Sequence, residues 1–154
     1  MEEILSREIL DISRDAIQDQ KEYIDSINKL IGGKNLKYHI ITYGCQMNVH
    51  DSEKLAGMLN AMGYTETSQQ SDADLILFNT CCVRENAEHR VYGNVGSLYP
   101  YKQQNPNLII GICGCMMQQS DVASYITQKF PFVDLIFGTH NLHHFPKLLL
   151  QAMD

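Results

Sequence analysis

Three apolar runs in this chain each lead directly into a cysteine. The runs at residues 38–44, 75–80 and 108–112 are followed by Cys45, by Cys81 and by Cys113-Gly114-Cys115. Runs rich in isoleucine and leucine, each followed by a helical pattern, are typical of buried parallel strands. Because ligands of open α/β sheets bind outside the carboxyl ends of the strands, we expect the cysteines to meet at that edge. The sequence therefore predicts a metal site built from Cys45, Cys81 and Cys115.

The context of the cysteines favours an iron–sulfur cluster over structural zinc. Structural zinc sites usually use Cys-x-x-Cys pairs, and the sequence contains none. Three thiolates with one open position suit a 4Fe-4S cluster, and a helix start favours the thiolate form of a nearby cysteine. A catalytic zinc ion with His50 as fourth ligand is an alternative. Cys82 and Cys113 are weaker candidates, and burial of the cysteines as small apolar side chains is the remaining alternative.

Length, charge and cysteine content narrow the class of protein. A chain of 154 residues fits one domain, and its formal net charge of -6 is the wrong sign for gripping a nucleic acid. Residues 1–37 carry six basic and eight acidic side chains, and residues 38–154 carry six and ten. There is no basic signal peptide and no apolar run of about 20 residues, so we expect a cytoplasmic protein without a membrane span. In that reducing compartment, cysteines act more often as ligands than as disulfides.

The N-terminal part has the pattern of an amphipathic helix. Apolar residues recur at helical spacing through residues 1–31, and Gly32-Gly33 is a natural stop. We expect residues 1–37 to form a helical arm that packs on the rest of the protein or on a second chain. Self-association through these N-terminal helices is therefore one hypothesis for the oligomeric state.

Residues 38–154 alternate between strand and helix patterns. Besides the three runs above, strand patterns occur weakly at residues 64–66 and clearly at 133–137; helix patterns occur at 49–63, 85–102, 120–129 and from Asn141 to the C-terminus. Pro100 is expected to end or kink the second of these helices. The alternation predicts an α/β fold, an open and mostly parallel sheet of four or five strands with helices on both faces, similar to Rossmann or flavodoxin-like folds.

Three ordered motifs carry a resemblance to a known family. They are Thr42-Tyr43-Gly44-Cys45-Gln46-Met47-Asn48, Asn79-Thr80-Cys81 with Val83-Arg84-Glu85-Asn86-Ala87-Glu88-His89-Arg90, and Gly114-Cys115-Met116. Together they resemble the N-terminal domain of radical-SAM methylthiotransferases. The Gly-Cys-Gln-Met-Asn form is similar to the branch that modifies isopentenyladenosine in tRNA. The resemblance covers about residues 38–150 and does not include the N-terminal arm.

The resemblance implies specific roles. Cys45, Cys81 and Cys115 would hold an auxiliary 4Fe-4S cluster whose free iron site takes part in delivering sulfur to carbon 2 of the adenine. Gln46, Asn48, Asn79 and Arg84 would shape the pocket around it, by their position in the motifs.

In the full-length family members, a central domain uses a second 4Fe-4S cluster and S-adenosylmethionine, and a C-terminal domain binds the tRNA. The Cys-x-x-x-Cys-x-x-Cys motif of that central domain does not occur here. We therefore expect this chain to be part of a larger enzyme, inactive alone and in contact with tRNA only through the full-length protein. The alternative is a flavodoxin-like module without a cluster, acting in thiol redox chemistry, with Cys113 as one partner, or in protein interaction.

Overall fold

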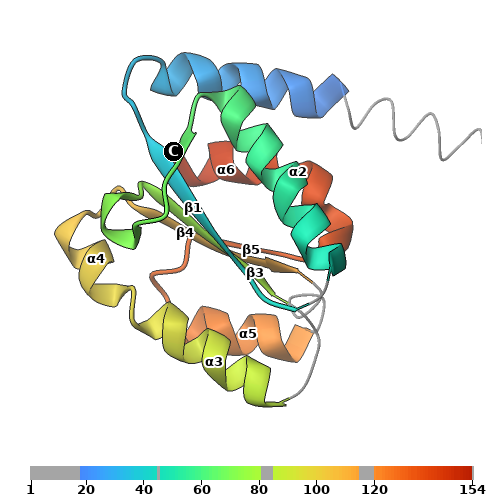
Figure 1. The fold of residues 1–154 in the computed structure, drawn as a ribbon, viewed down its shortest axis with the longest axis vertical. Coiled ribbons are helices and arrows are strands. Elements are labelled where there is room, and N and C mark those ends of the chain that lie inside the picture. Colours follow the sequence, from blue (N-terminus) through green and yellow to red (C-terminus); the bar gives the residue numbers. More distant parts are fainter. Residues whose placement is uncertain (1–17, 45, 81–84, 115–119, 154) are drawn as a thin grey trace, which may run out of the picture.

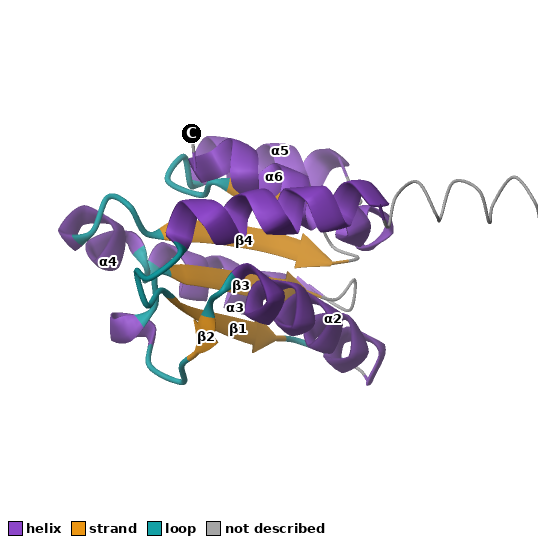
Figure 2. Cartoon of the chain, turned by 90° about the horizontal axis from the view of Figure 1, so that it is seen from above, coloured by secondary structure: helices purple, strands orange, loops and turns teal. Residues whose placement is uncertain are grey.

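The computed structural model describes residues 18–44, 46–80, 85–114 and 120–153, and it is an α/β fold (Figure 1). Its sheet has five strands in the order β2-β1-β3-β4-β5, and every neighbouring pair is parallel. The strands are β1 (Lys37–Thr42), β2 (Thr65–Glu66), β3 (Leu75–Thr80), β4 (Ile109–Gly114) and β5 (Leu135–Phe137). The arrows of β1, β3 and β4 point the same way in Figure 2. The predicted fold class is confirmed.

Helices cover both faces of the sheet. They are the N-terminal helix (residues 18–31), α2 (Gln46–Met62), α3 (Glu85–Gly96), α4 (Tyr99–Gln104), α5 (Ser120–Lys129) and α6 (Phe145–Met153), with the 3₁₀ segments η1 (Gln70–Asp72) and η3 (Thr139–His144). Figure 1 shows α2, α6 and the N-terminal helix on one face, and α3 and α5 on the other. Two hydrophobic cores result, one on each side of the sheet.

Alternate residues of the strands supply the two cores. Leu75 and Leu77 of β3 face the core under α2 and α6, whereas Ile76 and Phe78 face the core under α3 and α5. All six residues of β3 and all six of β4 are buried. A strand buried on both faces reads as a continuous apolar run, which explains why the sequence revealed these two strands so clearly.

Two predicted helices have different bounds in the structure. The single helix expected at residues 85–102 is divided into α3 and α4, because α3 ends at Gly96 and Pro100 lies in the first turn of a new helix. Proline has no backbone N–H, so it is tolerated in the first turn but not in a helix interior. The helix expected from Val49 begins three residues earlier, at Gln46.

The C-terminal part also differs in detail from the prediction. Asn141 does not cap a long helix but lies within η3, and α6 begins only at Phe145, with Pro146 as its second residue. The strand expected at residues 133–137 is shorter, because Val133 belongs to a turn and β5 begins at Leu135.

The N-terminal helix packs on the domain through one face. Ile27 and Ile31 are buried in the core under α2, and Asn28 Nδ2 donates a hydrogen bond to the carbonyl oxygen of Ala61 in α2 at 3.2 Å. Packing of residues 18–31 on the rest of the protein is therefore observed. The division of the chain at residue 37 and self-association through the arm stay predictions.

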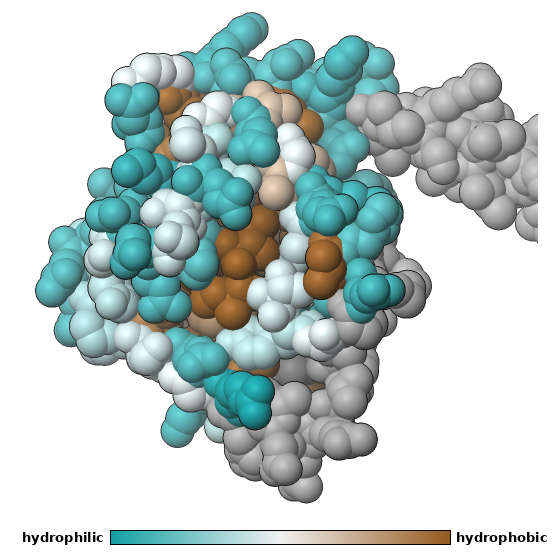
Figure 3. All heavy atoms as spheres, viewed as in Figure 1, coloured by the Kyte–Doolittle hydropathy of each residue, from teal (hydrophilic) through white to brown (hydrophobic). Residues whose placement is uncertain are grey.

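One edge of the sheet is only partly covered. β2 pairs with Lys37 and Tyr38, so the rest of β1 has no partner strand on that side within the described part of the chain. Ile40 and Ile41 are accordingly half-buried. In Figure 3, which has the same view as Figure 1, apolar surface lies in the middle of the molecule, between β1 and α2.

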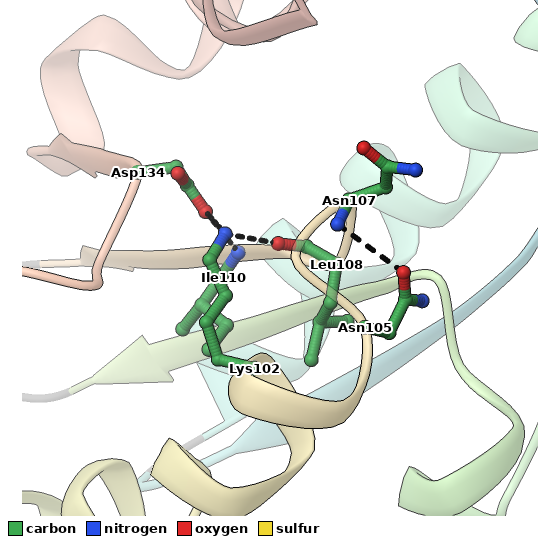
Figure 4. A network of polar contacts seen from close by, with 6 residues as sticks. All are labelled: Lys102, Asn105, Asn107, Leu108, Ile110 and Asp134. Atoms are coloured by element: carbon green, nitrogen blue, oxygen red, sulfur yellow. Dashed lines mark hydrogen bonds and ion pairs between the residues drawn. The ribbon is translucent and has the colours of Figure 1, made fainter.

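The amino ends of the strands are held by a polar network (Figure 4). Lys102 of α4 forms an ion pair with Asp134 at 2.8 Å and donates a second hydrogen bond to the carbonyl oxygen of Leu108. Asp134 also accepts a hydrogen bond from the backbone N–H of Ile110 at 2.9 Å. These contacts join the starts of β4 and β5 to α4, at the end of the sheet opposite the predicted site.

Burial of Tyr64 predicts a loss of stability at high pH. Desolvation, with a smaller contribution from the Asp74 carboxylate, raises the pKa of Tyr64 from 10.0 to about 12. The folded protein therefore holds the phenol proton more tightly than the unfolded chain does. The contribution of Tyr64 to the free energy of unfolding is fully present below pH 10 and is lost as the pH rises toward 12. Raising the pH from about 9 to about 11 should therefore lower the free energy of unfolding by about 1 kcal/mol through ionisation of Tyr64.

Urea unfolding of the wild type and of the Tyr64→Phe variant at both pH values measures this effect. The variant keeps the ring but has no titrating group, so its stability should fall less with pH. An equal fall in both proteins would contradict the prediction.

Candidate metal site at the carboxyl ends of the strands

The three segments that lead into the predicted ligands lie side by side. Cys45, Cys81 and Cys115 follow Gly44, Thr80 and Gly114, the last described residues at the ends of β1, β3 and β4. These strands are parallel neighbours, with Thr42 paired with Asn79 and Thr80 paired with Gly114. The three predicted ligands themselves, together with Cys82 and Arg84, lie outside the described residues.

Glycine allows the ends of β3 and β4 to come unusually close. Gly114 has a φ of 110°, which L side chains rarely adopt. A Cβ atom at this position would lie 2.1 Å from the carbonyl oxygen of Thr80 and 2.7 Å from its nitrogen. Gly44, which precedes Cys45, has a φ of 99°. The turn into two of the three predicted ligands therefore depends on glycine geometry.

Asn48 is a buried amide that bridges two of these strand ends. Its side chain is almost fully buried, and its Nδ2 donates to the carbonyl oxygens of Tyr43 at 2.6 Å and Thr80 at 2.7 Å. Because both partners are acceptors, the NH₂ group must face them. Asn48 thus connects the segment before Cys45 with the residue before Cys81.

Asn79 and Thr80 extend the same network. Asn79 is fully buried, and its Nδ2 donates to the carbonyl oxygen of Asn48 at 2.8 Å and to Ser52 Oγ at 3.0 Å. Thr80 is also fully buried, and its Oγ1 donates to the carbonyl oxygen of Cys113 at 2.7 Å. No buried side-chain nitrogen or oxygen of the described residues lacks a hydrogen-bond partner.

The predicted pocket residues therefore occupy different environments. Gln46 is exposed at the first position of α2, and Asn48 and Asn79 are enclosed by protein groups. The sequence indicated Asn48 and Asn79 by their place in the motifs, whereas the part played by Thr80 and Ser52 was not predicted. Asn48 and Ser52 belong to α2, and the register of β1, β3 and β4 brings Asn79 and Thr80 to them.

The N-terminus of α2 gives the site a favourable electrostatic environment for a thiolate. α2 begins at Gln46, the residue after Cys45, and its first turn contains no acidic side chain. The backbone N–H groups of a helix start carry partial positive charge, which stabilises an anion there. No carboxylate within this turn opposes that effect.

Cys113 is a core residue of β4. Its side chain is fully buried on the α2 side of the sheet, with Sγ 3.9 Å from Asn79 Oδ1, and it is a free thiol. Burial, with a smaller contribution from the Asp51 carboxylate, raises the pKa of the Cys113 thiol well above its usual range. Cys113, the weaker ligand candidate, thus points into the core, and its burial disfavours the alternative in which it forms a reversible disulfide.

Burial of Cys113 predicts that it resists alkylation. When the metal-free, reduced protein is treated with iodoacetamide under native conditions, Cys113 should stay unmodified, because the reagent cannot reach a fully buried thiol. Peptide mass spectrometry measures the label at each cysteine, and the same treatment in urea is the control that exposes every thiol. Rapid native labelling of Cys113 would contradict its placement in the core.

The described histidine and carboxylate side chains near the site do not form a metal centre. His50, the alternative zinc ligand, is mostly exposed, with Nδ1 3.9 Å from Glu53 Oε2. Among the residues that the structure describes, no group of three or more histidine, cysteine, aspartate or glutamate side chains is close enough to hold a metal ion. A metal site would therefore need side chains beyond those described, a group to which the three predicted ligands belong.

Two cavities lie away from the strand ends. One of about 580 Å³ is lined by Gln20, Met58 and Leu142, between the N-terminal helix, α2 and η3. The other, of about 570 Å³, lies at the amino ends of the strands beside Tyr64 and Asp74. Neither is lined by residues at the carboxyl ends of β1, β3 or β4.

In the described part of the chain, no helix has both the length and the apolar character required to cross a membrane.

The fold and the site define a class, a parallel α/β domain in which neighbouring strands lead into cysteines at one edge of the sheet. Residues 37–138, which span β1 to β5, match the family model described as "Uncharacterized protein family UPF0004". The chain belongs to this family.

The relatives agree with the resemblance drawn from the motifs. The chain is 61% identical over 140 residues to the tRNA-2-methylthio-N(6)-dimethylallyladenosine synthase of Caldicellulosiruptor saccharolyticus, covering 87% of this chain and 30% of that protein. It is 54% identical over 143 residues to the protein of the same name from Alkaliphilus oremlandii, covering 93% and 30%. For the protein of that name from Acetivibrio thermocellus, the identity is 53% over 149 residues, covering 93% and 31%. The chain thus spans less than a third of the length of these relatives.

Proposed function

We propose that this chain forms the auxiliary-cluster domain of an enzyme that methylthiolates carbon 2 of isopentenyladenosine in tRNA. The observation that carries the proposal is the convergence of β1, β3 and β4, whose ends lead into Cys45, Cys81 and Cys115. The name of the relatives supports the choice of reaction, since their product is 2-methylthio-N(6)-dimethylallyladenosine in tRNA.

The donor set fits a 4Fe-4S cluster. Three thiolates leave one iron without a protein ligand, and iron–sulfur clusters are held by cysteine thiolates. The carboxyl edge of a parallel sheet is also the place where such folds bind their ligands. In the proposed enzyme, Cys45, Cys81 and Cys115 ligate the cluster, which would supply the sulfur that reaches the nucleoside.

Two further residues are proposed to act at the rim of the site. Gln46 is exposed at the start of α2, directly after Cys45, so its side chain is free to contact a bound group. Arg84, three residues after Cys81, would offer a cation to an anionic ligand or to a cluster sulfide.

The other parts of the reaction are assigned to other parts of the enzyme. S-adenosylmethionine, a second 4Fe-4S cluster and the main tRNA contacts would belong to regions that the relatives possess beyond the matched third. The acidic charge of this chain, -6, agrees with an RNA-binding surface elsewhere, because phosphate contacts depend on lysine and arginine. We expect no methylthiolation from this chain alone.

A chimera tests the proposed reaction. In the Caldicellulosiruptor saccharolyticus relative, the segment that aligns with this chain is replaced by this chain's own residues, and the chimera is expressed in a host without its own methylthiotransferase. Mass spectrometry of the tRNA nucleosides should then show 2-methylthio-isopentenyladenosine. The unmodified relative is the positive control, and the relative without the segment is the negative control.

The chimera also has an outcome that contradicts the proposal. A folded chimera that contains iron but leaves only isopentenyladenosine in the tRNA would show that this chain does not support the reaction.

A further inference from the structure

Cysteine ligation alone does not explain why the buried network between the three strand ends is polar. A buried polar side chain must form hydrogen bonds to offset its desolvation, and an apolar residue would avoid that requirement. Asn48 and Asn79 nevertheless lie almost fully buried between α2 and the sheet. The hydrogen bonds of the Asn48 side chain end on the carbonyls of Tyr43 and Thr80, shortly before Cys45 and Cys81, so the network acts on the backbone that leads into these predicted ligands.

Asn48 links the chain segment after β1 to the end of β3. Its two amide hydrogens are used by the carbonyl of Tyr43, two residues before Cys45, and by the carbonyl of Thr80, directly before Cys81. The backbone N–H of Tyr43 donates to the backbone carbonyl of Asn79 at 2.9 Å, which joins the same two segments directly. The turn after β1 is thereby fixed to the end of β3 by three hydrogen bonds.

The third strand end is joined through Asn79 and Thr80. Thr80 Oγ1 donates to the carbonyl of Cys113, two residues before Cys115, and Cys113 Sγ lies near Asn79 Oδ1. Asn79 in turn donates to the backbone of Asn48. Asn48, Asn79 and Thr80 therefore connect the backbones that precede all three predicted ligands, without requiring a bound group.

We propose that Asn48 is a positioning residue for the thiol ligands, acting through the carbonyls of Tyr43 and Thr80 rather than by contact with the cluster. This inference rests on the proposed function, because it assumes that Cys45 and Cys81 are ligands. Residues that orient metal ligands typically change metal affinity about 10- to 100-fold when they are replaced. Loss of the Asn48 amide should therefore weaken the hold on the cluster without removing a ligand.

The experiment compares Asn48→Ala with two controls after anaerobic reconstitution with iron and sulfide. Asn60→Ala removes another asparagine of α2, whose Oδ1 accepts a hydrogen bond from Tyr38 at 3.1 Å, at the amino end of β1 and away from the predicted ligands. Asn28→Ala removes an amide of the N-terminal helix that, like that of Asn48, donates to a backbone carbonyl, here that of Ala61 in α2. Circular dichroism measures the folded fraction of each variant before the iron measurements.

Two readouts separate positioning from stability. The first is the rate at which a chelator removes iron, which should be about tenfold faster in Asn48→Ala than in the wild type and nearly unchanged in both controls. The second is the electron paramagnetic resonance spectrum of the reduced cluster, which should be shifted or broadened only in Asn48→Ala. A purely structural role would lower thermal stability but leave the spectrum of the folded fraction unchanged.

A smaller change keeps the test decisive if Asn48→Ala does not fold. Asn48→Ser keeps one hydrogen-bond donor, so it should show the same spectral change to a smaller degree. Wild-type iron with a superimposable spectrum and an equal rate of iron loss in the Asn48 variant would overturn the positioning role and leave the proposed function intact. Absence of iron in the wild type would overturn both.

Discussion

Replacing Gly114 with alanine should lower the free energy of unfolding by about 3 kcal/mol or more, because two penalties add at this position. The φ of 110° is unfavourable for any L side chain, and the new Cβ would lie 2.1 Å from the carbonyl oxygen of Thr80. That oxygen belongs to the backbone of a buried strand, so it cannot move away as a flexible side chain would. The ends of β3 and β4 would have to separate.

Urea unfolding measures this effect, and Gly93→Ala is the matched control. Gly93 is an exposed residue of α3, and no atom outside its own helix lies within 4 Å of a Cβ built there. Alanine at position 93 should be neutral or stabilising by up to about 1 kcal/mol. If Gly114→Ala unfolded at the same urea concentration as the wild type, the close approach of Gly114 to Thr80 would be wrong.

Changing any one of Cys45, Cys81 or Cys115 to alanine in the chimeric enzyme should abolish methylthiolation. With two cysteine ligands in place of three, the cluster is bound less tightly to the protein, and a second iron lacks a protein ligand. The tRNA should then accumulate isopentenyladenosine, because the earlier modification does not use this site. Mass spectrometry of the nucleosides measures both species in one sample.

Cys82→Ala is the matched control for this series, since Cys82 is the immediate neighbour of a predicted ligand. Its activity should remain close to that of the unmodified chimera. Product formed by a variant of Cys45, Cys81 or Cys115 would remove that residue from the ligand set.

The sequence predicted the sheet well, for a physical reason. β3 and β4 are buried on both faces, so the apolar runs Leu75–Phe78 and Ile109–Cys113 stand out from the helices. β2 pairs only two residues with β1, and its signal in the sequence was correspondingly weak. The boundary between α3 and α4 was missed because the expected helix continued past Gly96, and Pro100 was interpreted as an end rather than as a beginning.

The candidate site was predictable only in part. The cysteines could be assigned to one edge, since parallel strands bring their carboxyl ends together. The network of Asn48, Asn79 and Thr80 was not predictable, because its hydrogen bonds join residues about 30 positions apart and depend on strand register. The contact of Gly114 with Thr80 is of the same kind, and no local pattern reveals it.

Iron and acid-labile sulfide per chain, after anaerobic reconstitution, test the central claim most directly. The wild type should hold about four irons and four sulfides, and each alanine variant of Cys45, Cys81 and Cys115 should lose them. The Cys82→Ala and Asn60→Ala variants should retain the wild-type content. A wild type without iron, or iron content that is indifferent to the three cysteines, would contradict the cluster and favour a thiol-redox or interaction module.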